Sequence, residues 1–235
     1  MSCRKLNLQE SYPQLSNQAL RAATDGCFIS YCDNNDHCRY NKPYWEWPAL
    51  EKQGEVADGV YVHIDGQIPI IVSPTRGTVF WSKNEVLING DVGESYEKAV
   101  LDYSGKEKTA ELMAKGRELF GDEQETWKNN YAAPWCAAYN RSHEDGNGSV
   151  IGYGAGRWWL PSMGQLIAIW KRKESINRCL EVISGAQLLT DGITYSSTER
   201  SARQAWRINM ALGYIQSINK TSPTYSVRAV TSIVY

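Results

Sequence analysis

The chain has little that would place it in a membrane or on nucleic acid. None of its apolar runs is long enough to span a bilayer, and its first fifteen or so residues lack the apolar core of a signal peptide. The formal net charge is only -1, so nothing draws the whole molecule toward nucleic acid. We therefore expect no membrane insertion and no nucleic-acid partner.

Cysteine is sparse, and the six cysteines show no spacing typical of a disulfide framework, which favours reduced thiols. Cys27, Cys32, His37 and Cys38 together carry the atoms of a tetrahedral zinc site. Their C-x4-C-x4-H-C spacing lacks the usual C-x2-C element, and adjacent ligands are awkward. We predict no metal site, with structural thiols or a disulfide as the alternatives.

Two acidic turns offer oxygen atoms that calcium could use. One is the segment 33–36 (DNND), and the other contains Glu144, Asp145 and Asn147. Neither has the spaced oxygens and the distal bidentate Glu of an EF-hand. We interpret both as solvated turns.

Signatures of catalysis are also missing. The chain has three histidines, no G-x-S-x-G nucleophile elbow and no phosphate-binding glycine loop. The segment 152–156 (GYGAG) looks like a dinucleotide fingerprint, but it leads into Arg157-Trp158-Trp159-Leu160-Pro161 instead of opening a helix. We therefore predict a protein that is not an enzyme and needs no cofactor.

The chain is rich in aromatic residues with a polar tip: it has nine Trp and 14 Tyr against three Phe. Such residues suit half-buried strands and recognition surfaces. Residues 1–57 contain a polar, Cys-rich stretch and a proline-flanked aromatic segment, 43–48 (PYWEWP), that disfavours a helix. We interpret 1–57 as an irregular N-terminal extension packed on a main domain, 58–235, through its aromatic side chains.

Periodicity within 58–235 predicts short strands and two main helical regions. Alternating or continuous apolar runs indicate strands over 60–64, 68–72, 78–81, 86–88, 206–210 and 227–235, and helical patterns cover 95–101, 107–120 and 127–139, the last interrupted at Pro134. A capping box of Ser162 and Gln165 opens a long apolar-faced helix that reaches Gly185. This order predicts one α+β domain.

The most informative stretch is the C-terminal one, 194–235. Its residues fall into a regular framework and an irregular remainder. The framework comprises Ser196, Ser197, Thr198, Glu199, Ala205, Trp206, Gly213, Lys220, Val227, Arg228, Ala229 and Val230. The side chains between these positions follow no packing pattern, which predicts a surface that is varied for binding.

Leu212 is the clearest misfit in this stretch. A tight hairpin ending at Gly213 would favour Asn or Asp before the glycine, because a left-handed φ is costly for leucine. An exposed Leu at such a turn suits a position chosen for contact. Arg and Tyr, the residue types enriched at binding hot spots, cluster around it.

Three segments resemble a known superfamily. Gly156-Arg157-Trp158-Trp159-Leu160-Pro161-Ser162 is similar to the WYLPS segment of C-type-lectin-fold domains related to the formylglycine-generating enzyme. The ordered anchors from Tyr195-Ser196-Ser197-Thr198-Glu199 to Val227-Arg228 resemble the ending of those domains, and Asp102 to Thr109 resembles their helix entry. The resemblance covers about 58–235 and implies a C-type lectin fold.

Within that superfamily the chain most resembles the variable proteins of diversity-generating retroelements. The resemblance implies a ligand-binding variable region at about 194–226, which binds a host-cell surface protein or another macromolecule, on a phage tail or a bacterial cell surface. The implied contact residues are Tyr195, Arg200, Arg203, Arg207, Asn209, Ala211, Leu212, Tyr214, Ser217, Ile218, Thr221, Ser222 and Thr224.

Two other functions remain as alternatives on this fold. The first is an oxidase of the formylglycine-generating type, which needs paired reactive cysteines in its C-terminal part. Here Cys179 lies on the apolar face of the expected long helix, where a buried and inert thiol is expected. The second is a calcium-dependent sugar lectin.

Overall fold

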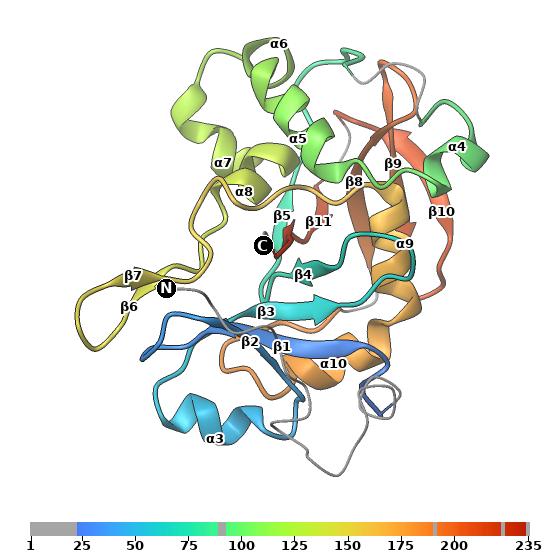
Figure 1. Ribbon diagram of the computed structural model, residues 1–235. Coiled ribbons are helices and arrows are strands. Elements are labelled where there is room, and N and C mark those ends of the chain that lie inside the picture. The colour runs from blue at the N-terminus through green and yellow to red at the C-terminus, as the bar shows by residue number, and fades with distance from the viewer. Residues whose placement is uncertain (1–22, 89–92, 190–191, 222–223, 234–235) are drawn as a thin grey trace.

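Two five-stranded sheets form the framework of the molecule, shown as a computed structural model in Figure 1. The structure describes residues 23–88, 93–189, 192–221 and 224–233. The strands are β1 (Cys27–Cys32), β2 (Arg39–Lys42), β3 (Ala57–Val62), β4 (Ile70–Val72), β5 (Gly77–Val79), β6 (His143–Glu144), β7 (Val150–Ile151), β8 (Ile193–Glu199), β9 (Gln204–Asn209), β10 (Ile215–Asn219), β11 (Tyr225–Val227) and β12 (Val230–Thr231). The first sheet has the order β12-β4-β3-β1-β2, the second β10-β9-β8-β11-β5, and β6 pairs with β7.

Helices cover both sheets. They are α3 (Trp47–Lys52), α4 (Tyr96–Val100), α5 (Gly105–Ala114), α6 (Gly116–Phe120), the 3-10 helix η2 (Gln124–Thr126), α7 (Trp127–Asn130), α8 (Ala132–Ala138), α9 (Met163–Lys171) and α10 (Lys173–Leu180). In Figure 1, α10 lies along the first sheet and α5 to α8 form a group at the opposite end of the molecule. Helices, together with sheets that are mainly antiparallel, confirm the predicted α+β class.

The N-terminal segment corrects one prediction. Residues 27–42 are not irregular: β1 and β2 pair antiparallel, and β1 also pairs with β3 in the first sheet. The expected boundary at 57/58 therefore falls inside β3. Our interpretation gave too much weight to the polar turn at 33–36 and too little to CFISYC, whose six residues are all buried in β1.

Several elements differ in detail from the periodicity. Residues 86–88 form no strand; instead Ile88 N donates to Glu199 Oε2 at 2.9 Å. The expected helix over 127–139 breaks at Tyr131, because Pro134 lies in the first turn of α8, where its missing N–H costs no helical bond. The predicted capping box is confirmed, with Ser162 N donating to Gln165 Oε1 at 3.0 Å.

The expected closing strand over 227–235 is two short strands in different sheets. β11 pairs with β5 and β8, whereas β12 pairs with β4. Arg228 lies at the crossing, is 2% exposed, and donates to the carbonyl oxygens of Ser73, Pro74, Gln187 and Leu188 at 2.7–3.1 Å. Burial lowers the pKa of Arg228 to about 10, so the guanidinium stays charged at neutral pH and holds the two sheets together.

A buried ion pair anchors the second sheet. Glu199 ends β8, Lys220 follows β10, and their side chains form an ion pair with both side chains fully buried. Lys220 Nζ also donates to Val86 O at 2.7 Å and lies 4.7 Å from the centroid of the Trp81 ring. Burial lowers the pKa of Lys220 below its ordinary value, and Glu199 opposes that shift.

We predict that Lys220→Met destabilises the protein, because it leaves the Glu199 carboxylate buried without a counter-charge. The expected loss is about 3–5 kcal/mol of unfolding free energy, measured by urea denaturation. Arg203→Met is the matched control: its pair with Glu85 is exposed, so removing it costs about 1 kcal/mol or less. Equal losses in the two variants would contradict the prediction.

Candidate binding surface of the C-terminal hairpin

The hairpin of β9 and β10 carries most of the predicted contact residues. The two strands pair antiparallel, with Arg207 opposite Gln216 and Ile208 opposite Ile215, and β10 is the edge of its sheet. We use the name hairpin surface for the predicted contact residues here that are exposed or half-buried. They are Arg200, Arg203, Arg207, Asn209, Ala211, Leu212, Tyr214, Ser217, Ile218, Thr221 and Thr224.

The turn at the tip of the hairpin is built by Asn209 and Gly213. Asn209 Oδ1 accepts from Ala211 N at 2.9 Å and from Leu212 N at 3.2 Å, and Gly213 N donates to Asn209 O at 2.8 Å. Gly213 takes the left-handed conformation, with φ at +72°. Leu212 is therefore not strained, which corrects our reasoning about its backbone, and its side chain is 61% exposed.

Gly213 has a second reason to be glycine. A Cβ placed there would lie 2.3 Å from the Trp170 ring of α9, so the tip of the hairpin packs directly on that indole. Glycine is thus required both by the backbone conformation and by the close approach. This contact fixes the position of Leu212 and Tyr214 relative to the helix.

We predict that Gly213→Ala destabilises the protein more than Gly66→Ala does. Both glycines have φ near +70°, so each alanine costs about 1–2 kcal/mol in backbone strain. At Gly213 the overlap with Trp170 adds about 1–3 kcal/mol, whereas nothing lies within 4 Å at Gly66. Urea denaturation measures both, and equal losses would show that the Trp170 contact is unimportant.

The three predicted arginines are held in different ways. Arg200 donates to Ser217 Oγ at 2.7 Å and lies over the Trp206 ring, 5.5 Å from its centroid. Arg207 lies the same distance from the Tyr225 ring and donates to Gln216 Oε1 at 2.9 Å.

Strand alternation puts Trp206 and Arg207 on opposite faces of β9, so Arg200 and Arg207 flank the hairpin on two sides. Arg203 extends beyond the strand and pairs with Glu85 at 3.0 Å. The sequence did not predict Gln216 as the partner of Arg207 or Glu85 as the partner of Arg203. Only the strand register and the path of the chain bring these residues together.

Apolar side chains project from the tip beside a polar hollow. Leu212 and Tyr214 are 61% and 64% exposed. Next to them lies a hollow of 310 Å³ whose lining includes Ala211, Trp170 and the basic run of Lys171, Arg172 and Lys173. Asp25 and Glu174 also line this hollow, so the tip combines exposed apolar side chains with charges of both signs, an arrangement suited to a macromolecular surface.

One predicted contact, Tyr195, does not belong to this surface. Tyr195 is fully buried, lies edge-on to Tyr225 at 5.4 Å between ring centroids, and belongs to the core formed with β5, β11 and α5 to α8. The prediction of Tyr195 as a contact is therefore wrong, because strand alternation turns its ring toward the helices. Ser222 lies outside the described residues.

The two acidic turns contact each other. His37 Nε2 lies 2.7 Å from Asp145 Oδ2, while Asp145 Oδ1 accepts from Asn147 N and Ser149 N at 2.8 Å each. In the 33–36 turn, Asp33 Oδ1 accepts from Asn35 N at 2.8 Å. Among the described residues, no group of His, Cys, Asp and Glu is placed to hold a metal ion. The carboxylates close the turns themselves.

We predict that Asp145→Asn lowers Tm at neutral pH. The backbone N–H of Ser149, with His37, lowers the pKa of Asp145 below its ordinary value. A lowered carboxyl pKa stabilises the fold above the unfolded pKa, about 3.9, and this contribution disappears as pH falls through the folded pKa. The Tm difference from the native protein should therefore shrink in acid.

Asp65→Asn is the control for this variant, because Asp65 pairs with His63 at 3.2 Å while its side chain is 87% exposed. It should change Tm little at any pH. A Tm difference for Asp145→Asn that stays constant down to about pH 2 would contradict the assignment.

The cysteine thiols in the described part of the chain are buried. Burial raises the pKa of Cys27 to about 12 and raises those of Cys136 and Cys179 well above the usual range. Cys179 belongs to α10 and packs in the core, as predicted from its place on the apolar face of the helix. A thiol that does not ionise at neutral pH is a poor nucleophile.

Comparison with known proteins assigns no family. No family model and no curated protein matches the chain. Among solved structures, a fimbrial protein from Bacteroides ovatus matches at 15% identity with a TM-score of 0.45. The match covers 70% of this chain and 35% of that one. No helix in the described ranges is both long and apolar enough to cross a bilayer.

Proposed function

We propose that this protein is a variable binding protein of the kind produced by diversity-generating retroelements. It has a C-type lectin fold, and its hairpin surface holds a macromolecular ligand, such as a host-cell surface protein, at a phage tail or a bacterial surface. The observation that supports this most is the division of the C-terminal stretch. Every framework residue is buried except the half-buried Gly213, whereas every predicted contact residue in the described ranges except the buried Tyr195 is exposed or half-buried.

Because of this division, the residues that stabilise the fold differ from those that can contact a ligand. Replacing an exposed side chain usually changes stability by less than about 0.5 kcal/mol, whereas buried replacements cost several times more. The hairpin surface can therefore change in sequence while Glu199, Lys220 and Arg228 keep the backbone in place. This is the property that a diversified binding protein requires.

The chemistry of the hairpin surface suits a protein ligand. Tyr and Arg are the residue types that dominate binding energy at interfaces. Tyr214 is exposed and Arg207 is half-buried, so both side chains offer surface to a ligand. The strand length places Arg203 and Tyr214 roughly 20 Å apart, at opposite ends of a stripe long enough for a protein contact.

We predict that the hairpin surface tolerates randomisation and yields new binders. A display library randomised at Arg203, Arg207, Leu212 and Tyr214 should keep most members folded, judged by protease resistance, and selection on hen egg-white lysozyme should recover binders. The matched library, at the buried positions 205, 206, 208 and 227, should lose folding.

Equal loss of folding in the two libraries, or failure to select binders from the first, would contradict the proposal. The DNA beside the gene gives an independent check. A near-repeat of codons 194–230 that differs mainly at adenines, next to a reverse-transcriptase gene, is the expected arrangement.

A further inference from the structure

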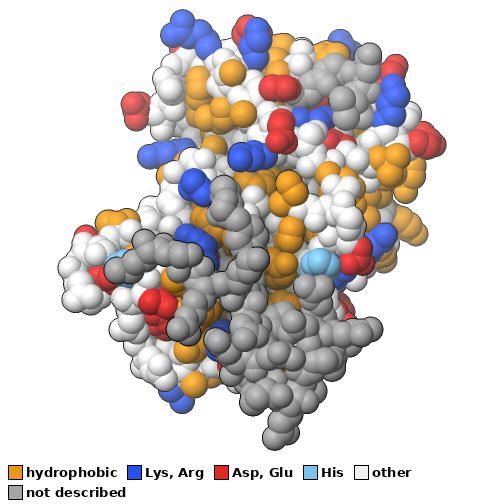
Figure 2. All heavy atoms as spheres, viewed as in Figure 1, with side chains coloured by type: hydrophobic (Ala, Val, Ile, Leu, Met, Phe, Trp, Pro, Cys, Tyr) orange, Lys and Arg blue, Asp and Glu red, His pale blue; other side chains and the backbone are white. Residues whose placement is uncertain are grey.

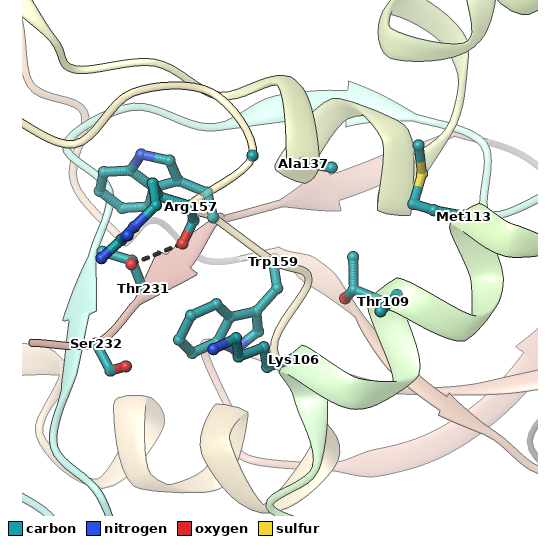
Figure 3. Close-up of a pocket in the computed structure, with 11 residues that line it drawn as sticks. Lys106, Thr109, Met113, Ala137, Arg157, Trp159, Thr231 and Ser232 are labelled. Carbon is teal, nitrogen blue, oxygen red and sulfur yellow. Dashed lines mark hydrogen bonds between the residues drawn. The ribbon is translucent and has the colours of Figure 1, made fainter. Parts of the chain in front are cut away.

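A second hollow lies away from the hairpin surface, between α5, α8 and the segment 156–159 (Figure 3). Its volume is 480 Å³, within the range of small-molecule sites. Lys106 and Arg157 line it, with Trp159 among the other lining residues. In Figure 3 the Lys106 side chain lies by the Trp159 ring, and Arg157 lies beside Thr231.

The charge around this hollow is one-sided. Lys106 and Arg157 are both exposed, and within the described ranges neither forms an ion pair and no carboxylate lines the hollow. Glu107 lines a smaller hollow of 160 Å³ that shares Lys106 and Trp159. Figure 2 shows Lys and Arg side chains on this side of the molecule, below the apolar side chains over α5 to α8.

The segments that carry Lys106 and Arg157 are fixed in the fold. Thr231 Oγ1 donates to Arg157 O at 2.7 Å, which ties the segment 156–159 to β12. Lys106 lies in the first turn of α5, with its Nζ 6.0 Å from the centroid of the Trp159 ring. The two cations are therefore carried by anchored segments that line the same hollow.

The opposite wall is apolar. It consists of Ala110 and Met113 of α5 and Ala137 of α8. Met113 and Ala137 also line a neighbouring hollow of 560 Å³ that reaches Trp127 and Pro134. An apolar floor thus continues away from the two cations along α7 and α8.

We propose that this hollow binds a small carboxylic acid that carries an apolar group. Its carboxylate accepts charge-assisted hydrogen bonds from Lys106 and Arg157, which are the strong class of such bonds. Its apolar part lies against Met113 and Ala137, where it removes apolar surface from water. A carboxylate without an apolar chain would leave Met113 and Ala137 uncontacted, and an apolar chain without a carboxylate would leave Lys106 and Arg157 without a counter-charge.

The test is calorimetric titration of the full chain with octanoate, octanamide and acetate. Octanoate should bind at least about tenfold more tightly than octanamide, because a hydrogen bond to a charged group is worth about 1.5–3 kcal/mol. Acetate should bind more weakly than octanoate because it has no apolar chain. The variants Lys106→Gln and Arg157→Gln should each weaken octanoate binding about tenfold or more.

Lys52→Gln on α3 is the control, since it removes an exposed cation far along the chain from the hollow and should leave octanoate affinity unchanged. Lys106→Arg should retain binding, which separates loss of charge from loss of packing. Met113→Asn should weaken octanoate but not acetate. Unchanged Tm values confirm that each variant is folded.

Three results would overturn the proposal. The first is that octanamide binds as tightly as octanoate. The second is that the double variant Lys106→Gln and Arg157→Gln binds octanoate as tightly as the native protein. A peptide ending in Leu with a free carboxylate could bind when octanoate does not, which would assign the hollow to a chain end instead. None of these outcomes bears on the hairpin surface, so this test is independent of the proposed function.

Discussion

The buried pair of Glu199 and Lys220 is the interaction on which the C-terminal half depends. It joins the end of β8 to the residue after β10, and it reaches the segment 86–88 through Val86 O and Ile88 N. Three stretches that are distant in sequence therefore share one charge cluster. A buried pair of this kind need not add net stability, but losing either partner leaves an uncompensated charge. The β9–β10 hairpin is thus held at both ends, by this pair at its base and by Trp170 beneath its tip.

That anchoring explains how a variable surface can coexist with a defined fold. The carbonyl contacts of Arg228 and the hydrogen bonds from Thr198 and Ser104 to Asp102 hold β8, α5 and the two sheets together without using any exposed contact residue. The proposed ligand-binding residues then need only remain compatible with a strand or a turn. The hollow beside Trp159 is a separate feature, built from α5, α8 and β12 instead of the hairpin.

Much of the framework could be predicted from the sequence. Alternation and capping residues indicated β9, the start of α9 and the burial of Cys179, because these signals depend on neighbours two to four residues away. The predicted exposure of Leu212 is also correct. Its supposed backbone strain was not, since the turn uses Asn209 as an acceptor and gives the left-handed position to Gly213.

The sequence could not determine which strands pair and which faces of them are buried. Nothing local distinguishes Tyr195, whose ring faces the helices, from Tyr214, which projects from the edge of the same sheet. Nor does it reveal that CFISYC joins the first sheet, or that the chain crosses between sheets at Arg228. Local periodicity determined β9, the start of α9 and the inert place of Cys179 on its helix. Tertiary structure decided which strands pair and which faces meet, because pairing and burial depend on contacts between residues that are not neighbours in the sequence.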